Sequence, residues 1–271
     1  MIQQIKYYKK LQDFLNSSLY SHQVVHITLG GNQIGSIGDS GLGSALVNCT
    51  NLLNLTLRLN YNQINNEGVS GLGYALAKCT NLSNLILDLG YNQIGQSGAS
   101  SLGSALAICV NLSNLKLSLS CNEIDAVGAS RLGSGLANCT NLSNLTLNLD
   151  YNYIGDEGAS GLGLALTKYI NLSNLTLNLE GNQIGVIGVS GLVFGLENYT
   201  NLSNFTLILS DNQIGDEGTL RLGSALANCT NLQKLTIIID QNKINQQQQQ
   251  LKVKSKCLKS KRLVVFEINF Q

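Results

Sequence analysis

The hydrophobic residues of this chain follow two spacings that alternate along the sequence. From residue 145 to 150, a leucine at every second position alternates with a polar residue. A period of two predicts a β-strand that buries one face. From 158 to 169 the apolar residues stand three and four positions apart, at Leu162, Ala165, Leu166 and Tyr169. This second spacing predicts a helix with one apolar stripe.

The strand and the helix together form a unit of 30 residues that repeats along most of the chain. Each unit carries an asparagine at the same position and an isoleucine two residues later. Without a slip, the asparagines are Asn32, Asn62, Asn92, Asn122, Asn152, Asn182, Asn212 and Asn242. Self-similarity at a fixed period of this length indicates a repeat architecture.

One unit cannot fold alone. The three leucines of its strand contribute about 6 kcal/mol, at roughly 2 kcal/mol per buried side chain. Ordering one unit costs on the order of 30 kcal/mol. The helix also contains glycines, such as Gly158, Gly161 and Gly163, and each interior glycine costs up to about 1 kcal/mol relative to alanine. We therefore expect the units to stack, so that each covers the leucines of its neighbours.

The pattern L-x-L-x-x-N-x-I from Leu147 to Ile154 resembles the strand half of a leucine-rich repeat. The glycine-rich segment that follows it, 155–166, resembles the helical half of the ribonuclease-inhibitor-like subtype. The resemblance extends over roughly residues 24 to 245. It implies an α/β fold, a right-handed horseshoe-shaped solenoid with parallel strands on its concave face and helices on its convex face. The unit is slightly longer than is usual for this family, so the curvature of the array can differ.

The resemblance also implies that the recurring asparagines, Asn32 to Asn242, are structural. A buried polar side chain needs hydrogen-bond partners. An asparagine that points inward at the end of a strand can bond backbone groups of its own turn and of the next. We therefore expect these asparagines to form a ladder along the stacked units.

The ends of the array need caps, because terminal units expose apolar faces. Rough helical spacing of apolar residues from 2 to 19 predicts an N-terminal capping helix within residues 1–23. The repeat array occupies 24–245, with its first strand at Val25 to Gly30. Residues 246–271 then form a degenerate repeat and C-terminal cap, with a final strand at 263–270. The basic stretch 252–262 is interpreted either as an anion-binding or localisation signal or as lysines that blunt an edge strand.

Charge and composition narrow the classes of partner. Net charge is +1 and charged residues make up only 12% of the chain, so no global field attracts nucleic acid or an anionic membrane. The N-terminus lacks the apolar core of a signal peptide, and no 18-residue apolar run suggests a membrane span. We expect a monomeric cytoplasmic protein, with the nucleus as an alternative location.

The sequence contains few of the residue patterns that catalysis or metal binding requires. Five of its seven cysteines occupy one repeat position, where Tyr169 and Tyr199 stand in other units, so we interpret them as core thiols. No CxxC pair, P-loop lysine or kinase catalytic loop occurs. His26 is expected on the first concave strand, without an oriented base–nucleophile partner. We therefore expect no enzyme activity, no cofactor and no metal.

The residues that vary between units lie in rows on the expected concave face. Tyrosine and arginine are enriched at interface hot spots. We predict a protein-binding surface of Arg58, Tyr61, Asp88, Tyr91, Lys116, Asp150, Tyr151, Glu180 and Asp211, with the last acidic residues as a margin. The alternative is that tyrosine merely fills a half-buried strand position that tolerates it.

The function predicted from these rows is a non-catalytic scaffold for a protein partner. A regulator of an enzyme, such as a GTPase activator or a ubiquitin-ligase adaptor, is the alternative. One branch of the family that the chain resembles activates a nuclear-transport GTPase, but those members carry a long acidic tail, whereas this chain is basic near its end.

Overall fold

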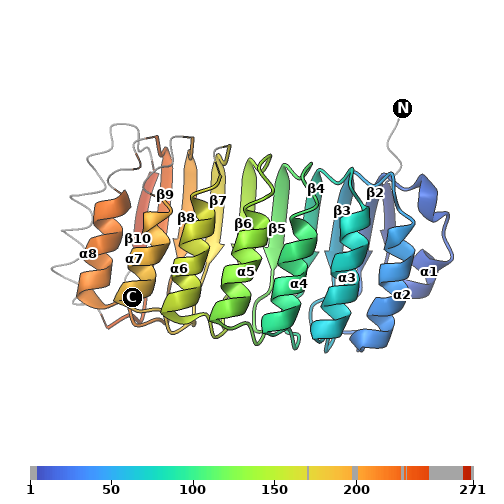
Figure 1. The fold of residues 1–271 in the computed structure, drawn as a ribbon, viewed down its shortest axis with the longest axis horizontal. Helices are drawn as coiled ribbons and strands as arrows, with labels where there is room; N and C mark the ends of the chain where they lie inside the picture. The colour runs from blue at the N-terminus through green and yellow to red at the C-terminus, as the bar shows by residue number, and fades with distance from the viewer. Residues whose placement is uncertain are drawn as a thin grey trace.

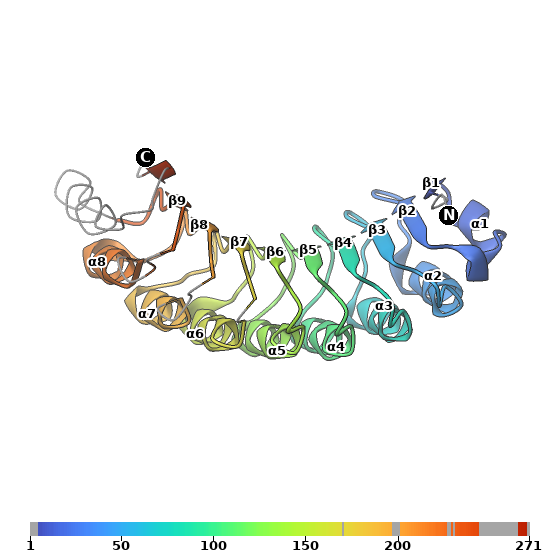
Figure 2. The ribbon, with the colours of Figure 1, turned by 90° about the horizontal axis from the view of Figure 1, so that it is seen from above.

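The computed structural model describes residues 5–169, 171–196, 201–226, 229, 231–243 and 265–269, with 36–40 and 265–269 described by their backbone alone. Strands line the inner side of an arc and helices line its outer side (Figure 1 and Figure 2). The expected α/β solenoid, with parallel strands on the concave face and helices on the convex face, is therefore confirmed.

The described strands form one parallel sheet in chain order. They are β1 Ile5–Tyr8, β2 Val24–Thr28, β3 Asn54–Arg58, β4 Asn84–Asp88, β5 Asn114–Ser118, β6 Asn144–Asn148, β7 Asn174–Asn178, β8 Asn204–Ile208, β9 Lys234–Ile238 and β10 Val265–Asn269. The helices are α1 Leu11–Leu15, η1 (a 3₁₀ turn) Leu19–Ser21, α2 Gly35–Val47, α3 Asn66–Lys78, α4 Gln96–Leu106, α5 Ala126–Leu136, α6 Gly155–Leu166, α7 Val186–Phe194 and α8 Gly215–Leu226.

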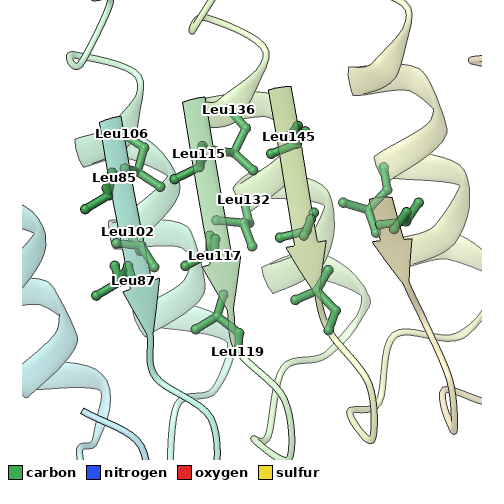
Figure 3. Close-up of a cluster of buried hydrophobic side chains, with 14 of the residues drawn as sticks. Leu85, Leu87, Leu102, Leu106, Leu115, Leu117, Leu119, Leu132, Leu136 and Leu145 are labelled. Carbon is green, nitrogen blue, oxygen red and sulfur yellow. The ribbon is translucent and has the colours of Figure 1, made fainter. Parts of the chain in front are cut away.

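The register of the sheet follows the sequence period. Leu55 of β3 pairs with Leu85 of β4, which pairs with Leu115 of β5. Because this offset equals the repeat length, equivalent side chains of successive coils lie in rows across the sheet. The inward rows are mostly leucines, and the leucines of β4 and β5 point toward leucines of α4 and α5 (Figure 3). All of these leucines are buried, so the coils share one continuous core.

The predicted N-terminal helix over residues 2 to 19 is wrong in its main part. Ile5–Tyr8 form strand β1, parallel to β2, with Tyr7 opposite His26. Only Leu11–Leu15 form an α-helix before the η1 turn. A strand here satisfies the N–H and C=O groups along the free edge of β2, while the fully buried Phe14 covers the first core layer.

The other end agrees with the sequence where the structure describes it. The predicted final strand is present as β10, which pairs parallel to β9. Residues 244–264, which include the basic stretch 252–262, lie outside the described residues. The predicted end of the array at 245 and the degenerate repeat after it therefore remain predictions.

The helical glycines let neighbouring helices touch backbone to backbone. A Cβ atom added to Gly135 of α5 would overlap the Gly103 carbonyl of α4, and one added to Gly195 after α7 would overlap the Gly163 carbonyl of α6. By contrast, a Cβ atom on Gly71 of α3 would meet nothing within 4 Å. Much of the glycine content that weakens an isolated helix therefore serves close packing of the convex layer.

The repeated cysteines are buried, as their repeat position predicted. From Cys79 onward their thiols donate to a carbonyl at the end of the preceding coil's helix; Cys139 Sγ, for example, lies 3.1 Å from the Leu106 carbonyl oxygen, whereas Cys49 donates to Ala45 of its own helix. Burial raises the pKa of Cys49 to about 11. For Cys79 the pKa rises to about 12, through burial and then the charges of Cys49 and Cys109. These thiols are therefore weak nucleophiles.

The recurring asparagines bridge consecutive coils. The Asn152 side chain donates to the carbonyl oxygens of Leu149 (3.0 Å) and Leu119 (3.0 Å), and it accepts from the Ile124 N–H (3.0 Å). Asn152 therefore bonds backbone groups of its own coil and of the preceding coil, whereas we expected bonds to its own coil and the next. Asn32 differs from the rest because it is exposed and its amide donates to Gly30 in its own coil (2.9 Å).

Helix starts are also joined across coils. Asp125 caps its own helix α5 by accepting from the Gly128 N–H at 2.8 Å. Asp156 instead accepts from Gly185 (2.6 Å) and Gly188 (2.9 Å), at the start of the next coil's helix α7. An aspartate near a helix start therefore accepts from free N–H groups either of its own helix, as Asp125 does, or of the next coil's helix, as Asp156 does.

Candidate interaction face

A groove runs along the concave face over strands β2 to β8, with a volume of about 630 Å³. Its floor consists of outward-facing side chains of the strands, which the register places in rows two residues apart. Charged, hydroxyl, amide and apolar groups all occur there, among them Arg58, Asp88, Lys116, Asn148, Thr176 and Ile208. The groove thus has a mixed lining suited to a polypeptide.

The residue that precedes each recurring asparagine has an unusual backbone. At every position of this column φ is positive, between +50° and +69°: Gly31, Tyr61, Tyr91, Cys121, Tyr151, Gly181, Asp211 and Gln241. Glycine adopts this left-handed region freely, whereas other residues are strained there by about 1–2 kcal/mol. Three tyrosines therefore occupy a position that the backbone alone would assign to glycine.

Two of these tyrosines contact each other. The rings of Tyr61 and Tyr91 stack with centroids 4.1 Å apart and planes inclined by 14°. Both remain about half exposed, at 54% and 49%. Hydrogen bonding with Cys121, and then with Tyr61, raises the pKa of the Tyr91 hydroxyl. The pair forms a flat, partly exposed aromatic surface beside the groove, of the kind that protein interfaces use.

The third tyrosine belongs to a different environment. The Tyr151 hydroxyl donates to Glu180 Oε1 at 2.9 Å, and this hydrogen bond, followed by the negative charge of Glu180, raises the pKa of Tyr151. Its ring covers Gly181, where a Cβ atom would lie 2.6 Å from a ring carbon. The three tyrosines of the predicted surface therefore do not form one cluster, and Tyr151 lies with the acidic residues.

Carboxylates gather at the end of the concave face that follows β6, β7 and β8. Burial, and then the charge of Glu180, raise the pKa of Asp150. The Oδ1 atom of Asp150 is buried without a hydrogen-bond partner. Asp211 follows one coil later, and its negative charge also contributes to the raised pKa of Tyr151. The carboxylates predicted as an acidic margin therefore lie near one another as like charges, and their place at the border of a binding surface stays a prediction.

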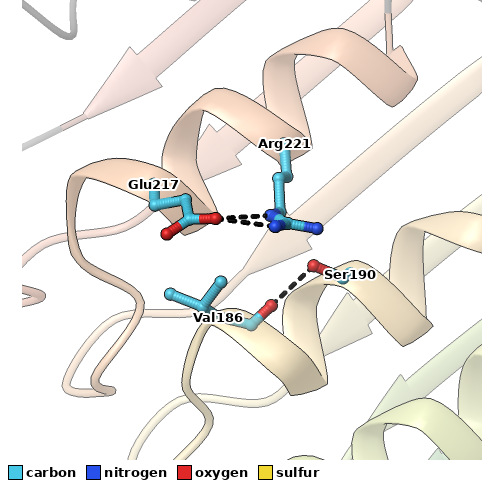
Figure 4. A network of polar contacts seen from close by, with 4 residues as sticks. All are labelled: Val186, Ser190, Glu217 and Arg221. Atoms are coloured by element: carbon cyan, nitrogen blue, oxygen red, sulfur yellow. Dashed lines mark hydrogen bonds and ion pairs between the residues drawn. The ribbon is translucent and has the colours of Figure 1, made fainter.

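The cations on this face stand apart from those carboxylates. Arg58 is paired in register with Asp88, yet Asp88 Oδ1 accepts from the Gly90 N–H at 3.2 Å. Within the described part of the chain, the ion pair found is that of Arg221 with Glu217, at 2.6 Å on the convex helix α8 (Figure 4). Arg58 and Lys116 are exposed and have no ionic partner among the described residues.

A second asparagine ladder borders the groove at the strand starts, and the sequence analysis missed it. Each amide donates to the asparagine of the preceding coil, along the row Asn54, Asn84, Asn114, Asn144, Asn174 and Asn204. The spacing of 30 residues was the available signal. Identical amides in register favour such ladders, so this edge of the groove is fixed by its own hydrogen bonds.

His26 lies on the concave strand β2, as predicted, with its ring stacked on Tyr7 at 4.7 Å. His22 lies instead beneath the sheet edge, where its Nε2 atom is 3.1 Å from the Tyr8 hydroxyl and 3.0 Å from Ser17 Oγ. Among the residues with described side chains, no group of three His, Cys, Asp or Glu is arranged to hold a metal ion. The same part of the chain has no helix both long and apolar enough to cross a bilayer.

Comparison with family models gives one result. The model described as Leucine Rich repeat matches residues 51–73, 81–103, 111–133, 141–163, 171–193 and 203–222. Each match begins 30 or 32 residues after the previous one and covers a strand together with most of its helix. The matched family is a repeat rather than a catalytic domain. A search of curated proteins finds no match.

Proposed function

We propose that this chain, which belongs to the leucine-rich repeat family, is a non-catalytic scaffold that binds a protein partner on its concave face. Arrays of this family are generally protein-binding modules. The observation that carries the proposal is the column of left-handed residues. Tyrosine persists there at three positions despite the strain, and strained residues cluster where function requires them.

The groove adds a second line of support. A volume of about 630 Å³ spans seven strands, so a bound segment could contact several coils at once. The aromatic pair Tyr61 and Tyr91 lies beside it, and tyrosine supplies a large contact area at small entropic cost. Under this proposal the tyrosines contribute contact area to the partner and do not merely fill a tolerated strand position.

The proposal includes a cytoplasmic or nuclear setting and a partner that is neither nucleic acid nor membrane. Six free cysteines in the described residues support a reducing compartment, because disulfides form and persist in oxidising ones. The carboxylates on the concave face argue against nucleic acid, since they would repel phosphates.

The test compares two tyrosine variants in a quantitative pull-down from cells. The double variant Tyr61→Ala/Tyr91→Ala removes the stacked pair, and Tyr74→Ala removes a tyrosine that is 62% exposed on the convex helix α3. We expect the double variant to lose its main partner at least about tenfold, which is the effect of a hot-spot aromatic pair. Retention of every partner by the double variant, or equal loss with Tyr74→Ala, would refute the proposal.

A further inference from the structure

From β3 to the turn after β8, the charges on the concave face are sorted along the array; Lys234, at the start of β9, lies beyond this stretch. Arg58 on β3 and Lys116 on β5 lie toward the N-terminal end, with Asp88 between them on β4. After β6, β7 and β8 come Asp150, Glu180 and Asp211. The floor between these groups is neutral, with Ser118, Asn148, Thr146, Thr176 and Asn178 lining it.

We propose that the concave groove binds an extended, charge-segregated segment of a partner protein, whose acidic residues lie on Arg58 and Lys116 and whose basic residues lie on Glu180, Asp211 and Asp150. This inference rests on the proposed function and specifies the chemistry of the partner. The segment runs along the array, across the strands, because the charges differ from coil to coil and not along one strand.

The cationic end supports this assignment through its unused donors. Neither Arg58 nor Lys116 has a carboxylate within ion-pair distance among the described residues, and both are exposed in the groove. Asp88, the nearest carboxylate in register, is held by the Gly90 N–H. An arginine presents several N–H donors in a planar fork that matches a carboxylate, so acidic side chains are the complementary partner here.

The acidic end supports it through uncompensated like charges. Glu180 lies close enough to Asp150 for its charge to raise the pKa of Asp150, and Tyr151 is the one hydrogen-bond donor assigned to the Glu180 carboxylate in the described chain. Asp150 also has an acceptor atom without a partner. Like charges held together disfavour ionisation, and arginine or lysine side chains from a partner would relieve that repulsion.

The distance between the two ends sets the spacing of the partner's charges. The cations centre on β4 and the carboxylates on β7, three strand steps apart. At about 4.8 Å per step this is about 14 Å across the strands, and the carboxylates also lie about three residues, or about 10 Å, further along the strands than the cations; an extended chain at about 3.3 Å per residue therefore needs about five residues to join them. We therefore expect an acidic block and a basic block separated by about five neutral residues.

Synthetic peptides test this directly against the full-length chain. One probe carries three glutamates, five neutral residues and three arginines; a second has the same composition with the charges alternating. Fluorescence anisotropy at low salt should show the block peptide binding at least about tenfold more tightly, since the alternating peptide puts like charges together at both ends. Equal affinity for the two peptides would overturn the proposal.

Variants place the binding on the named residues. Glu180→Gln/Asp211→Asn should weaken the block peptide about tenfold, whereas Glu157→Gln, on the exposed convex surface of α6, should leave it unchanged. Asp150 is left intact in these variants because it is half-buried. In the charge-reversal variant Glu180→Arg/Asp211→Arg, the tighter binding should pass from the block peptide to an all-acidic peptide. Equal weakening by the convex variant, or no transfer, would contradict the assignment.

The same measurements separate the two proposals. If the tyrosine double variant loses its partner while block and alternating peptides bind alike, the scaffold function stands and the charge-segregated partner is wrong. If the block peptide is preferred and the tyrosine variant keeps all its partners, the groove recognises charge while the tyrosines contribute no binding.

Discussion

The convex layer and the concave face arise from the same repeated unit, yet they differ in how far the chain completes its own contacts. On the convex side, helices touch backbone to backbone at Gly103 and Gly135, and Arg221 is paired with Glu217. On the concave side, tyrosines hold a left-handed backbone, and Arg58 and Lys116 have no ionic partner within the described residues. The comparison teaches that the outer layer completes its contacts within the stack, while the inner face leaves charged side chains without an ionic partner among the described residues.

The largest effect is expected from breaking the asparagine ladder that joins consecutive coils. Asn152→Leu would leave the Ile124 N–H without its acceptor, while the Leu119 and Leu149 carbonyls would each lose one donor and keep another, from Asn122 and Asn182. One unsatisfied buried group costs about 1–3 kcal/mol and each lost hydrogen bond about 1 kcal/mol, so we expect a loss of about 3–5 kcal/mol in the free energy of unfolding by urea. The exposed Asn32→Leu is the control and should change it by less than about 1 kcal/mol; equal losses would show that the ladder is not structural.

A smaller effect tests the helix packing of the convex layer. Gly135→Ala should lower the free energy of unfolding by about 1–3 kcal/mol, because the added methyl group overlaps the neighbouring helix. Gly71→Ala has open space and should raise it by up to about 1 kcal/mol through helix propensity. Thermal or urea unfolding of both variants checks the prediction, and a gain in stability for Gly135→Ala would mean that the helices are not in backbone contact.

The strain of the concave column can be measured without disturbing a side chain. Gly31 has φ +69° and nothing within 4 Å of an added Cβ atom. Gly31→Ala therefore measures the cost of the left-handed backbone alone, without a steric clash. We expect a loss of about 1 kcal/mol, and a gain of similar size for Cys121→Gly in the same column. If Gly31→Ala costs nothing, the tyrosines are unstrained and the strain argument for their function fails.

The smallest effect concerns the N-terminal edge. Burial, and secondly the charge of Lys6, lower the pKa of His22. The folded chain therefore favours neutral His22, while the unfolded chain takes up a proton below its ordinary pKa of about 6.5. Stability is full above about pH 6.5 and falls as the pH drops below it, by up to about 1 kcal/mol at pH 5.5. Urea unfolding at the two pH values should show a smaller difference for His22→Gln than for the wild type; an equal difference would assign the pH effect elsewhere.

The sequence predicted most of the fold because every unit repeats the same evidence. Leu145, Leu147 and Leu149 alternate in a way that one strand alone would leave ambiguous, but each position recurs coil after coil. The N-terminal edge lacked such repetition. There, Leu11, Phe14 and Leu15 have helical spacing, and the four residues of β1 are too few to show a period. The strand forms because the edge of β2 is free, which is a property of the sheet and not of the segment.

The sequence predicted which residues lie on the concave face, but not their backbone and side-chain conformations. Register alone identified Arg58, Lys116 and the acidic residues as concave. The left-handed backbone was missed because Tyr61 carries no local signal for it; Gly31 and Gly181 in the same column were the hint. Whether two tyrosines stack, as Tyr61 and Tyr91 do, or one turns to Glu180 depends on neighbouring coils, which only three-dimensional packing reveals.

The most direct test removes one whole coil. Excision of residues 92–121 joins Tyr91 to Asn122 in the same register and deletes Lys116 from the groove. If the coils are equivalent units that share one core while the inner face carries the specificity, the shortened chain will unfold cooperatively with helix and strand content per residue unchanged, and it will lose its preference for the block peptide. An unfolded shortened chain, or a folded one with the same preference, would contradict this division between the two layers.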